Sequence, residues 1–545
     1  MKPIKQPLFL LATAFSMCLS GCSDLDVPVE SEFTPGNFPS TPSEYIAATG
    51  PVYSQLAVQY NANRTGLLAS YATEYWQLQE LSTDAAIIPA RDGNFDDGGQ
   101  FRQLHQHTWS PDHVTVTRIW QWGYGGINIA NRVIGLFEST PNSPTKTASL
   151  AELRAMRALY HYYMMDLYGN VPIITVFGST NQPTNAKRAE VYAFIESELK
   201  AVMPNLSTSA GALTYGRVTK WMAQALLAKM YLNAEVYTGQ PRYHESLAAC
   251  DTILTKVGNL HTLDADYQSI FNPDNGPQIR DVIFAIPYDG TLIKGNYFTR
   301  FATHPLLMTK YNIPNRPSIA MSTIKEFHAK FNLPGDVRND TWLIGKQFDF
   351  SGRPITQATT KRGLDATYAG ADGSAAVTWQ LEFSPDLTLV NAAKMDVGND
   401  VLAQAKGIRS VKFYPDKNSA PDRYQGNDLP VFRLADIYLM KVEAILRGVP
   451  ATTVGSELQT PVVLVNKLRA RAKTTPVTTV DLNLLLDERV RELSWEGWRR
   501  NDLIRFCQFE NVWGFKDNKE VFRRLYPIPA NERSLNPSLV QNPGY

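Results

Sequence analysis

The chain has 545 residues and a mass of 60.9 kDa, and its 53 Lys and Arg residues balance 52 Asp and Glu residues. This balance excludes nucleic-acid binding through an overall basic charge, because neutralising phosphates requires a basic excess or stripe. The 44% apolar and 11% aromatic content excludes an intrinsically disordered protein. After residue 20 no apolar run approaches the ~18–20 residues of a spanning helix, which excludes a polytopic membrane protein.

Residues 1–21 have the pattern of an export signal, with Lys2 and Lys5 before a short apolar stretch. The ending Leu19-Ser-Gly-Cys22 is typical of a bacterial lipobox, in which Cys22 is acylated and becomes the first mature residue. The alternative is an ordinary secretory peptide with Cys22 near its cleavage point by chance. Acyl chains would hold Cys22 on a membrane, since each buried CH₂ contributes ~0.8 kcal/mol. Prolines in residues 22–45 predict an extended tether.

Apolar residues recur at helical spacing in several segments, which predicts a mostly α-helical protein. A helix from Leu150 should end at Gly169, because Gly169 and Pro172 form a C-terminal stop signal. The small residues of 223–237 and the Tyr and Leu positions of 243–254, with a Gly-Pro turn between, resemble a tetratricopeptide helix pair. Further helices are expected at 432–446, 462–472 and 485–495.

Two stretches lack helical periodicity and are rich in Gly, Asp and Asn: residues 81–109 and 257–430. Long irregular segments of this kind are usually functional or disordered. Only short strands are expected there, such as 282–286. The predicted organisation is therefore a helical half at 46–256, a loop-rich portion at 257–430 and a helical end at 431–545.

No catalytic motif is present: the chain has neither a phosphate-binding G-x-x-x-x-G-K-[ST] loop nor a G-x-S-x-G nucleophile elbow. His105, His107 and His113 form the one histidine cluster, but no Cys or carboxylate pair is spaced to complete a metal site, so packing or surface histidines are favoured. We expect no enzyme, cofactor or metal, although sequence cannot exclude a carboxylate pair of the glycosidase kind. Cys250 and Cys507 could form a disulfide or remain two buried thiols.

Several blocks of sequence resemble the SusD/RagB family across essentially the whole mature chain. They are the segments FRLADIYLMKVEA from Phe432, LDERVRELSWEGWRRNDLIR from Leu486 and YPIPANE from Tyr526, with WQWGYGGINIAN from Trp120 in the N-terminal half. The resemblance implies a lipid-anchored protein on the surface of the outer membrane of Bacteroidetes. Such a protein captures nutrients, usually glycans, caps a TonB-dependent transporter of the SusC type, and is not an enzyme. Its tetratricopeptide-like helices are the scaffold, and the irregular portion carries the ligand site.

Sugar rings stack on aromatic faces, and their hydroxyl groups suit carboxylates, amides and arginine. The irregular stretches contain these groups together, and the candidate ligand-binding residues are Asp84, Arg91, Asp92, Asn94, Phe95, Tyr288, Tyr297 and Trp379. The expected function is capture of an oligosaccharide and its delivery to a SusC-like transporter. The alternatives are a non-sugar nutrient such as a peptide, or a structural lid without its own ligand.

The segment from Glu488 to Arg505 interleaves acidic and basic residues with Leu493, Trp495 and Trp498. Residues three and four apart on a helix can pair. We expect these charges to form a solvated lattice of ion pairs that fixes helix packing, in preference to contacting a substrate.

Overall fold

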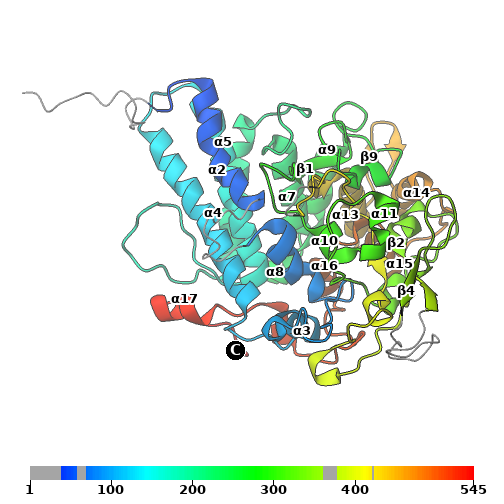
Figure 1. The fold of residues 1–545 in the computed structure, drawn as a ribbon. Coiled ribbons are helices and arrows are strands. Elements are labelled where there is room, and N and C mark those ends of the chain that lie inside the picture. The colour runs from blue at the N-terminus through cyan, green and yellow to red at the C-terminus, as the bar shows by residue number, and fades with distance from the viewer. Residues whose placement is uncertain (1–37, 58–68, 360–376, 420–422) are drawn as a thin grey trace, which may run out of the picture.

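A computed structural model describes residues 38–57, 69–359, 377–419 and 423–545. The predicted signal 1–21, the lipidation site Cys22 and most of the tether lie outside the described residues. Long helices gather on one side of the molecule, and loops with short strands occupy much of the other side (Figure 1). The expected class, mostly α-helical with an irregular portion and few short strands, is confirmed.

The N-terminal helices pack against one another in chain order, as α4 on α5, α5 on α6, and α7 on α9. Gly123 and Gly126 of α4 lie against Met164 and Tyr160 of α5, where any β-carbon would overlap those side chains. The glycines therefore set how closely the two longest helices approach. The helices are α2 (Pro42–Ala57), α3 (Gln100–Gln106), α4 (Val114–Glu138), α5 (Pro144–Tyr168), α6 (Arg188–Val202), α7 (Lys220–Leu232), α8 (Ala234–Thr238) and α9 (Tyr243–Leu254).

The predicted helix ends are largely confirmed in this half. α5 ends before Gly169, whose φ of 75° explains the choice of glycine. The second helix of the predicted pair has the expected bounds, Tyr243–Leu254. The first differs, because the chain leaves helical geometry at Asn233 and divides it into α7 and α8. The Asn233 amide there donates to the Lys229 carbonyl at 2.9 Å.

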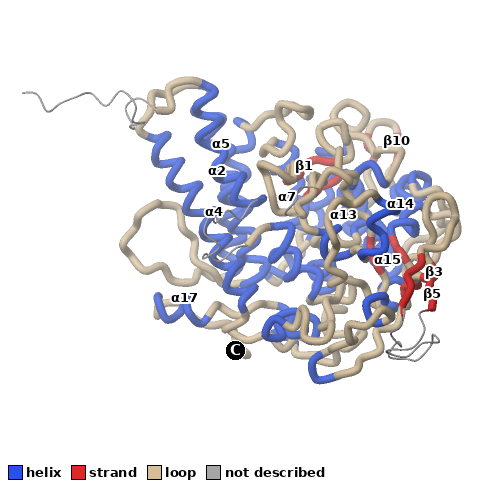
Figure 2. Tube along the Cα trace, viewed as in Figure 1, coloured by secondary structure: helices blue, strands red, loops and turns tan. Residues whose placement is uncertain are grey.

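The strands of the irregular portion are short and form two-stranded sheets. Figure 2 shows these short strands among long loops. The predicted strand at 282–286 is confirmed as β1, which pairs antiparallel with β8. The antiparallel pairs are β1 (Val282–Ile286) with β8 (Leu429–Arg433), β2 (Trp342–Leu343) with β7 (Arg409–Ser410), β3 (Gly345–Lys346) with β6 (Glu382–Phe383), β4 (Thr356–Thr359) with β5 (Val377–Gln380), and β9 (Thr453–Val454) with β10 (Glu457–Leu458).

Short helices complete this portion, and longer helices follow it. The described helices are α10 (Phe298–Ala302), α11 (Met308–Tyr311), α12 (Lys325–His328), α13 (Leu434–Leu446), α14 (Pro461–Arg471), α15 (Leu482–Leu493), α16 (Arg499–Arg505) and α17 (Ala530–Leu535). The helix expected at 432–446 begins two residues later, because Phe432 and Arg433 belong to β8. α13 packs against α9, α14 and α15, so the C-terminal helices continue the N-terminal scaffold.

The charged face of α15 is buried in a network of ion pairs. Glu492 has no exposed surface and contacts Arg471 at 2.5 Å, Arg433 at 3.0 Å and Arg338 at 3.2 Å. Burial alone raises its pKa, but the surrounding guanidinium groups outweigh burial and hold the pKa well below the ordinary value. Glu492 is therefore a buried carboxylate that its three arginines keep ionised.

The network extends from α15 into the loop-rich portion. Glu496 accepts two hydrogen bonds from Arg433, both at 2.7 Å, and one from Lys412 at 2.7 Å. Arg433 also pairs with Asp281 at 2.8 Å, the residue that precedes β1. The other members are Asp336, Arg338, Arg469, Glu488 and Arg491. We use the name Glu492 network for the whole set: Asp281, Asp336, Arg338, Lys412, Arg433, Arg469, Arg471, Glu488, Arg491, Glu492 and Glu496.

A second buried cluster joins the N-terminal helices to α13, α15 and α16. Lys229 of α7 contacts Asp436 at 2.5 Å, and Arg489 joins Asp436 at 2.9 Å to Asp502 at 2.8 Å. The predicted structural role of these charges is confirmed, but the expectation that they are solvated is wrong. Each charge in this cluster pairs with an opposite charge on another helix, and this permits its burial.

Cys250 is buried and Cys507 is exposed, and the two are not bonded to each other. In the part of the chain that the structure describes, no helix combines the length and apolarity needed to cross a membrane.

Replacing Glu492 by Gln should destabilise the protein by about 3–5 kcal/mol, because three buried arginines lose their shared carboxylate. The measurement is chemical denaturation at pH 7. The matched control is Glu245→Gln, which removes a carboxylate that is 45% exposed and pairs with Arg242. An exposed pair of this kind contributes less than about 1 kcal/mol.

The Glu492→Gln effect should also depend on pH. A carboxylate with a depressed pKa stabilises the fold fully above its unfolded-state pKa, near 4.5, and loses that contribution as pH falls toward the folded-state pKa. The gap between wild type and variant should therefore narrow below about pH 4.5. A gap of equal size at pH 7 and pH 3.5 would contradict an ionised Glu492.

Candidate functional site

A tight turn at 91–94 projects the first group of predicted ligand residues. The Arg91 amide donates to the Asn94 carbonyl at 2.8 Å, and Asp92 and Gly93 have φ of 50° and 81°. The amides of Asp92 and Gly93 donate to the Asp396 carboxylate at 2.9 and 3.3 Å. Burial raises the pKa of Asp396, but these amides and that of Gly398 lower it below its ordinary value. An anchored turn thus presents exposed Asp92 and Asn94 and half-buried Phe95.

Asp84 and Arg91 are committed to the framework. Asp84 pairs with Arg499 through two contacts of 2.6 Å, near the start of α16. Arg91 has no exposed surface and donates to the Ala403 carbonyl at 2.5 Å and the Lys406 carbonyl at 3.2 Å. Burial lowers the pKa of Arg91 to about 9, although the negative charge of Asp396 acts in the opposite direction and raises it. We assign both residues a structural role in place of the predicted ligand contact.

Phe95 and Tyr297 lie together, although about 200 residues separate them in sequence. Both line a shallow depression with a cavity volume of only about 30 Å³, so a ligand would lie across its aromatic rim. Phe101 and Phe301 line it as well, and all four rings are half-buried. We call these four residues the aromatic depression.

The floor of the aromatic depression is rigid core. Trp76 and Phe298 line it, are 2% and 4% exposed, and meet edge to face at 5.3 Å between ring centroids. Phe298 also stacks on Phe413 at 4.4 Å with the rings 8° apart. The floor is therefore fixed before any ligand arrives.

One wall of the depression combines aromatic and basic groups. Tyr297 packs on Tyr424 at 4.4 Å and on Phe301 at 5.7 Å. The Arg300 guanidinium lies 5.2 Å from the ring centres of both Tyr297 and Phe301. Aromatic faces beside a guanidinium can hold a ring with polar edges by stacking and hydrogen bonding.

The other two predicted aromatic residues lie elsewhere. Trp379 is in β5 and packs on the small apolar cluster around Leu381 and Phe383. Tyr288 is 5% exposed, donates to the Ala57 carbonyl at 3.3 Å and lines a separate groove. Conversely, Phe101 and Phe301 line the depression but are not among the predicted ligand residues. The spacing of Tyr297 and Phe301, four residues apart in a helical turn, could have indicated Phe301.

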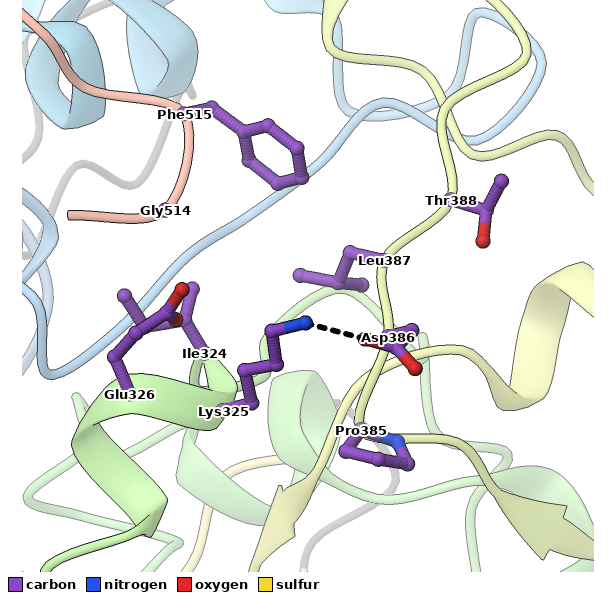
Figure 3. A pocket seen from close by; sticks show the side chains of 9 residues that line it. All are labelled: Ile324, Lys325, Glu326, Pro385, Asp386, Leu387, Thr388, Gly514 and Phe515. Atoms are coloured by element: carbon purple, nitrogen blue, oxygen red, sulfur yellow. Dashed lines mark hydrogen bonds and ion pairs between the residues drawn. The ribbon is translucent and has the colours of Figure 1, made fainter.

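A different pocket lies between α12, residues 385–388 and residues 514–515 (Figure 3). Its volume is about 390 Å³. Lys325 and Asp386 in its lining form an ion pair of 2.9 Å, with both side chains 61% exposed. Phe515 is the one aromatic residue in its lining, so this pocket offers a ring fewer stacking surfaces than the aromatic depression.

The three clustered histidines do not converge. His107 and His113 each have a ring nitrogen close to a backbone carbonyl, of Ser82 at 2.8 Å and of Gln100 at 3.0 Å. Burial lowers the pKa of His105 and of His113 to about 4, so both are neutral at pH 7. Among the described residues, no group of three or more His, Cys, Asp or Glu is arranged to hold a metal ion.

Two family profiles match this chain. The one described as "SusD family" matches residues 336–545, and the one described as "Starch-binding associating with outer membrane" matches residues 56–232. The chain belongs to the SusD/RagB family. The matched ranges contain the turn at 91–94 and the members of the Glu492 network other than Asp281. Asp281 and Tyr297 lie between the two ranges.

Similar proteins cover nearly the whole chain. The starch-binding protein SusD of Bacteroides thetaiotaomicron is 27% identical to this chain, in an alignment 577 positions long that covers 98% of each protein. A crystal structure of a SusD superfamily protein from Parabacteroides distasonis aligns with a TM-score of 0.69 and 21% identity over 92% of this chain and 99% of that chain. Surface glycan-binding protein A from B. thetaiotaomicron in complex with laminarihexaose aligns with a TM-score of 0.68 and 18% identity, over the same shares. These two structures establish a shared fold.

The structural role of Asp84 can be tested by Asp84→Asn. Loss of the bidentate contact with Arg499 should cost about 1.5–3 kcal/mol of stability, measured by chemical denaturation. Asp386→Asn is the matched control, because it breaks an ion pair in which both partners are 61% exposed and should change stability by less than about 1 kcal/mol. Equal effects of the two substitutions would contradict the framework role.

Proposed function

We propose that this protein captures an oligosaccharide at the bacterial cell surface and delivers it to a SusC-like TonB-dependent transporter. The observation that carries the proposal is the aromatic depression, where Phe95 and Phe101 from one irregular stretch meet Tyr297 and Phe301 from another. Sugar rings bind by stacking on such faces while hydroxyl groups contact nearby polar side chains. The starch- and glycan-binding relatives support this ligand class.

The charged groups around the depression favour binding without covalent chemistry. Asp96 is held by Arg102 at 2.9 Å, and the Asp396 carboxylate accepts backbone amides of the turn at 91–94. A general acid in glycoside hydrolysis needs a carboxyl group with a raised pKa, whereas the pKa of Asp396 is lowered. Asp396 is therefore unsuited to the role of a general acid, and we propose that the protein binds its ligand and is not an enzyme.

The proposed location is the outer membrane, with acyl chains on Cys22. The tether, predicted at 22–45, is proposed to end before α2, because residues 42–45 belong to that helix. We propose that the helical scaffold of 46–256 contacts the transporter, and that 257–430 and 81–109 carry the ligand. A binder of a non-sugar nutrient such as a peptide is the second candidate, since aromatic rims and Arg300 also suit peptides. A structural lid without its own ligand is the third.

Removing one ring should separate these candidates. Phe95→Ala and Tyr297→Ala should each weaken binding at least tenfold, or about 1.4 kcal/mol, because each removes a stacking surface. Binding is measured by gel retardation on amylopectin, laminarin, xyloglucan and galactomannan, followed by calorimetry on the polymer that retards the wild type.

The matched control is Phe177→Ala, which removes a ring that is 53% exposed and outside the depression lining. Its binding and melting temperature should equal those of the wild type. Retardation of the wild type that survives both Phe95→Ala and Tyr297→Ala would place the sugar elsewhere. An absence of any retardation would favour the peptide binder or the lid.

The lipid anchor is tested by Cys22→Ser in the full-length protein. This substitution removes the thiol that would carry the acyl chains and should move the protein from the membrane fraction to the soluble fraction. Fractionation and labelling with a radioactive fatty acid provide the measurement. Membrane retention with unchanged labelling would contradict acylation at Cys22.

A further inference from the structure

A second and larger concavity lies beside the aromatic depression. Its volume is about 940 Å³, close to the upper end of the range for ligand pockets. It is bounded by the loop before α7, residues 268–277, the end of β1, the end of α11, and the segments 414–418 and 426–428. We call it the tyrosine groove, because Tyr215, Tyr288, Tyr311 and Tyr414 line it.

Rings form an aromatic ridge at one end of the tyrosine groove. Tyr414 is half-buried and meets Tyr311 edge to face at 5.6 Å. Tyr311 is 8% exposed and meets Phe350 in the same manner at 5.7 Å. Phe350 is 71% exposed, and the Lys310 ammonium lies 5.2 Å from its ring centre. The ridge therefore runs from Tyr414 and Tyr311, which line the groove, to the exposed ring of Phe350.

Polar groups surround these rings. Asn418 and Asp274 are exposed, whereas Asp416 and Asp428 are committed to the fold. Asp416 accepts the amides of Asn418 at 2.7 Å and Gly426 at 3.0 Å, and Asp428 accepts the Tyr288 amide at 2.7 Å. Amides and carboxylates on a rim suit the hydroxyl groups of sugars.

The acidic lining of the groove favours neutral over anionic polysaccharides. Its lining contains the carboxyl groups of Asp274, Asp289 and Asp416 and one lysine, Lys417. Asp428 also lines it, but burial raises the pKa of this carboxyl group to about 7, so it adds only part of a negative charge at neutral pH. A bound metal ion could offset this negative charge. Among the described residues, however, no cluster of these carboxyl groups is arranged to hold one. Like charges close together repel. An anionic polysaccharide is therefore disfavoured, and a neutral one is not.

One shared wall separates the tyrosine groove from the aromatic depression. Tyr424 packs on Tyr297 in the depression, and Gly426, two residues later, lines the groove. The wall is held by the Gln425 amide, which donates to the Asn296 carbonyl at 3.1 Å, and by the Asn296 side chain, which donates to the Asn427 carbonyl at 2.9 Å. A ligand that crosses this wall can occupy both sites.

We propose that the tyrosine groove is a second carbohydrate subsite, which holds the continuation of a neutral glycan chain whose other part lies on the aromatic depression. The proposal rests on the proposed function and adds to it a preference for long, uncharged polysaccharides. Two linked subsites raise the affinity for a polymer without any new contact at either one. A short fragment occupies one subsite and gains nothing from the other.

The test compares polymer with fragment in Tyr414→Ala and in Asn418→Ala/Asp274→Ala. The probes are the four neutral polymers used for Phe95→Ala, with polygalacturonate and alginate as anionic polymers, and the trisaccharide of the neutral polymer that binds. Both variants should weaken binding of the polymer at least tenfold while changing the affinity for the trisaccharide less than twofold. Phe177→Ala should change neither. The double variant alters exposed side chains alone, so it remains informative if Tyr414→Ala does not fold.

The outcomes distinguish the two proposals. Loss of polymer binding in Phe95→Ala with wild-type binding in both groove variants would overturn the second subsite and leave the proposed function intact. Retardation by polygalacturonate or alginate that the groove variants abolish would overturn the neutral ligand class. If no polymer retards the wild type, the proposed function fails and the second subsite fails with it.

Discussion

The burial of ionised side chains around Glu492 is the constraint on which the rest of the structure depends. Removing a carboxylate from water costs several kcal/mol, and the cost is offset only when its partners are held in place. Glu492 therefore requires Arg338, Arg433 and Arg471 at 2.5–3.2 Å, and these come from three different segments. Slippage of any one segment would leave a buried charge unpaired. The network thus specifies one arrangement of chain segments more than it adds net stability.

The same network positions the ligand walls. Arg433 ends β8 and is joined to Asp281, which precedes β1, so the charges fix one end of the antiparallel β1–β8 pair. At the other end, the Asp428 carboxylate accepts the Tyr288 amide at 2.7 Å. From β1 the chain leads to Tyr297, and Tyr424 lies on the segment that leads into β8. The aromatic contact of Tyr297 with Tyr424 is therefore built on strands that the ion pairs hold. Substitutions at Tyr297 and Tyr424 can therefore alter the wall of the depression without changing the ion pairs of the Glu492 network.

Local patterns predicted local structure well and long-range relations poorly. The helix at 243–254 and the strand at 282–286 have the expected bounds, because periodicity and flanking turn residues act over a few positions. The buried state of Arg489 and Glu492 was predicted wrongly, since alternating charges on a helix indicate solvent unless the partners on other segments are known. For the same reason the sequence could select Phe95 and Tyr297 as aromatic residues in loops but could not separate them from Trp379. Which rings share a surface depends on contacts between distant segments.

The two concavities divide ligand recognition in a way that the scaffold permits. The floor of the aromatic depression is fixed by Trp76 and Phe298, which belong to the core, so its shape is set by the fold. The rim of the tyrosine groove includes exposed residues, such as Asn418 and Asp274, that have no comparable role in packing. Substitutions at this rim alter hydrogen bonding and charge at little cost in stability. On the proposal of two subsites, the depression supplies a general affinity for rings, and the groove is where selectivity among glycans can change most readily.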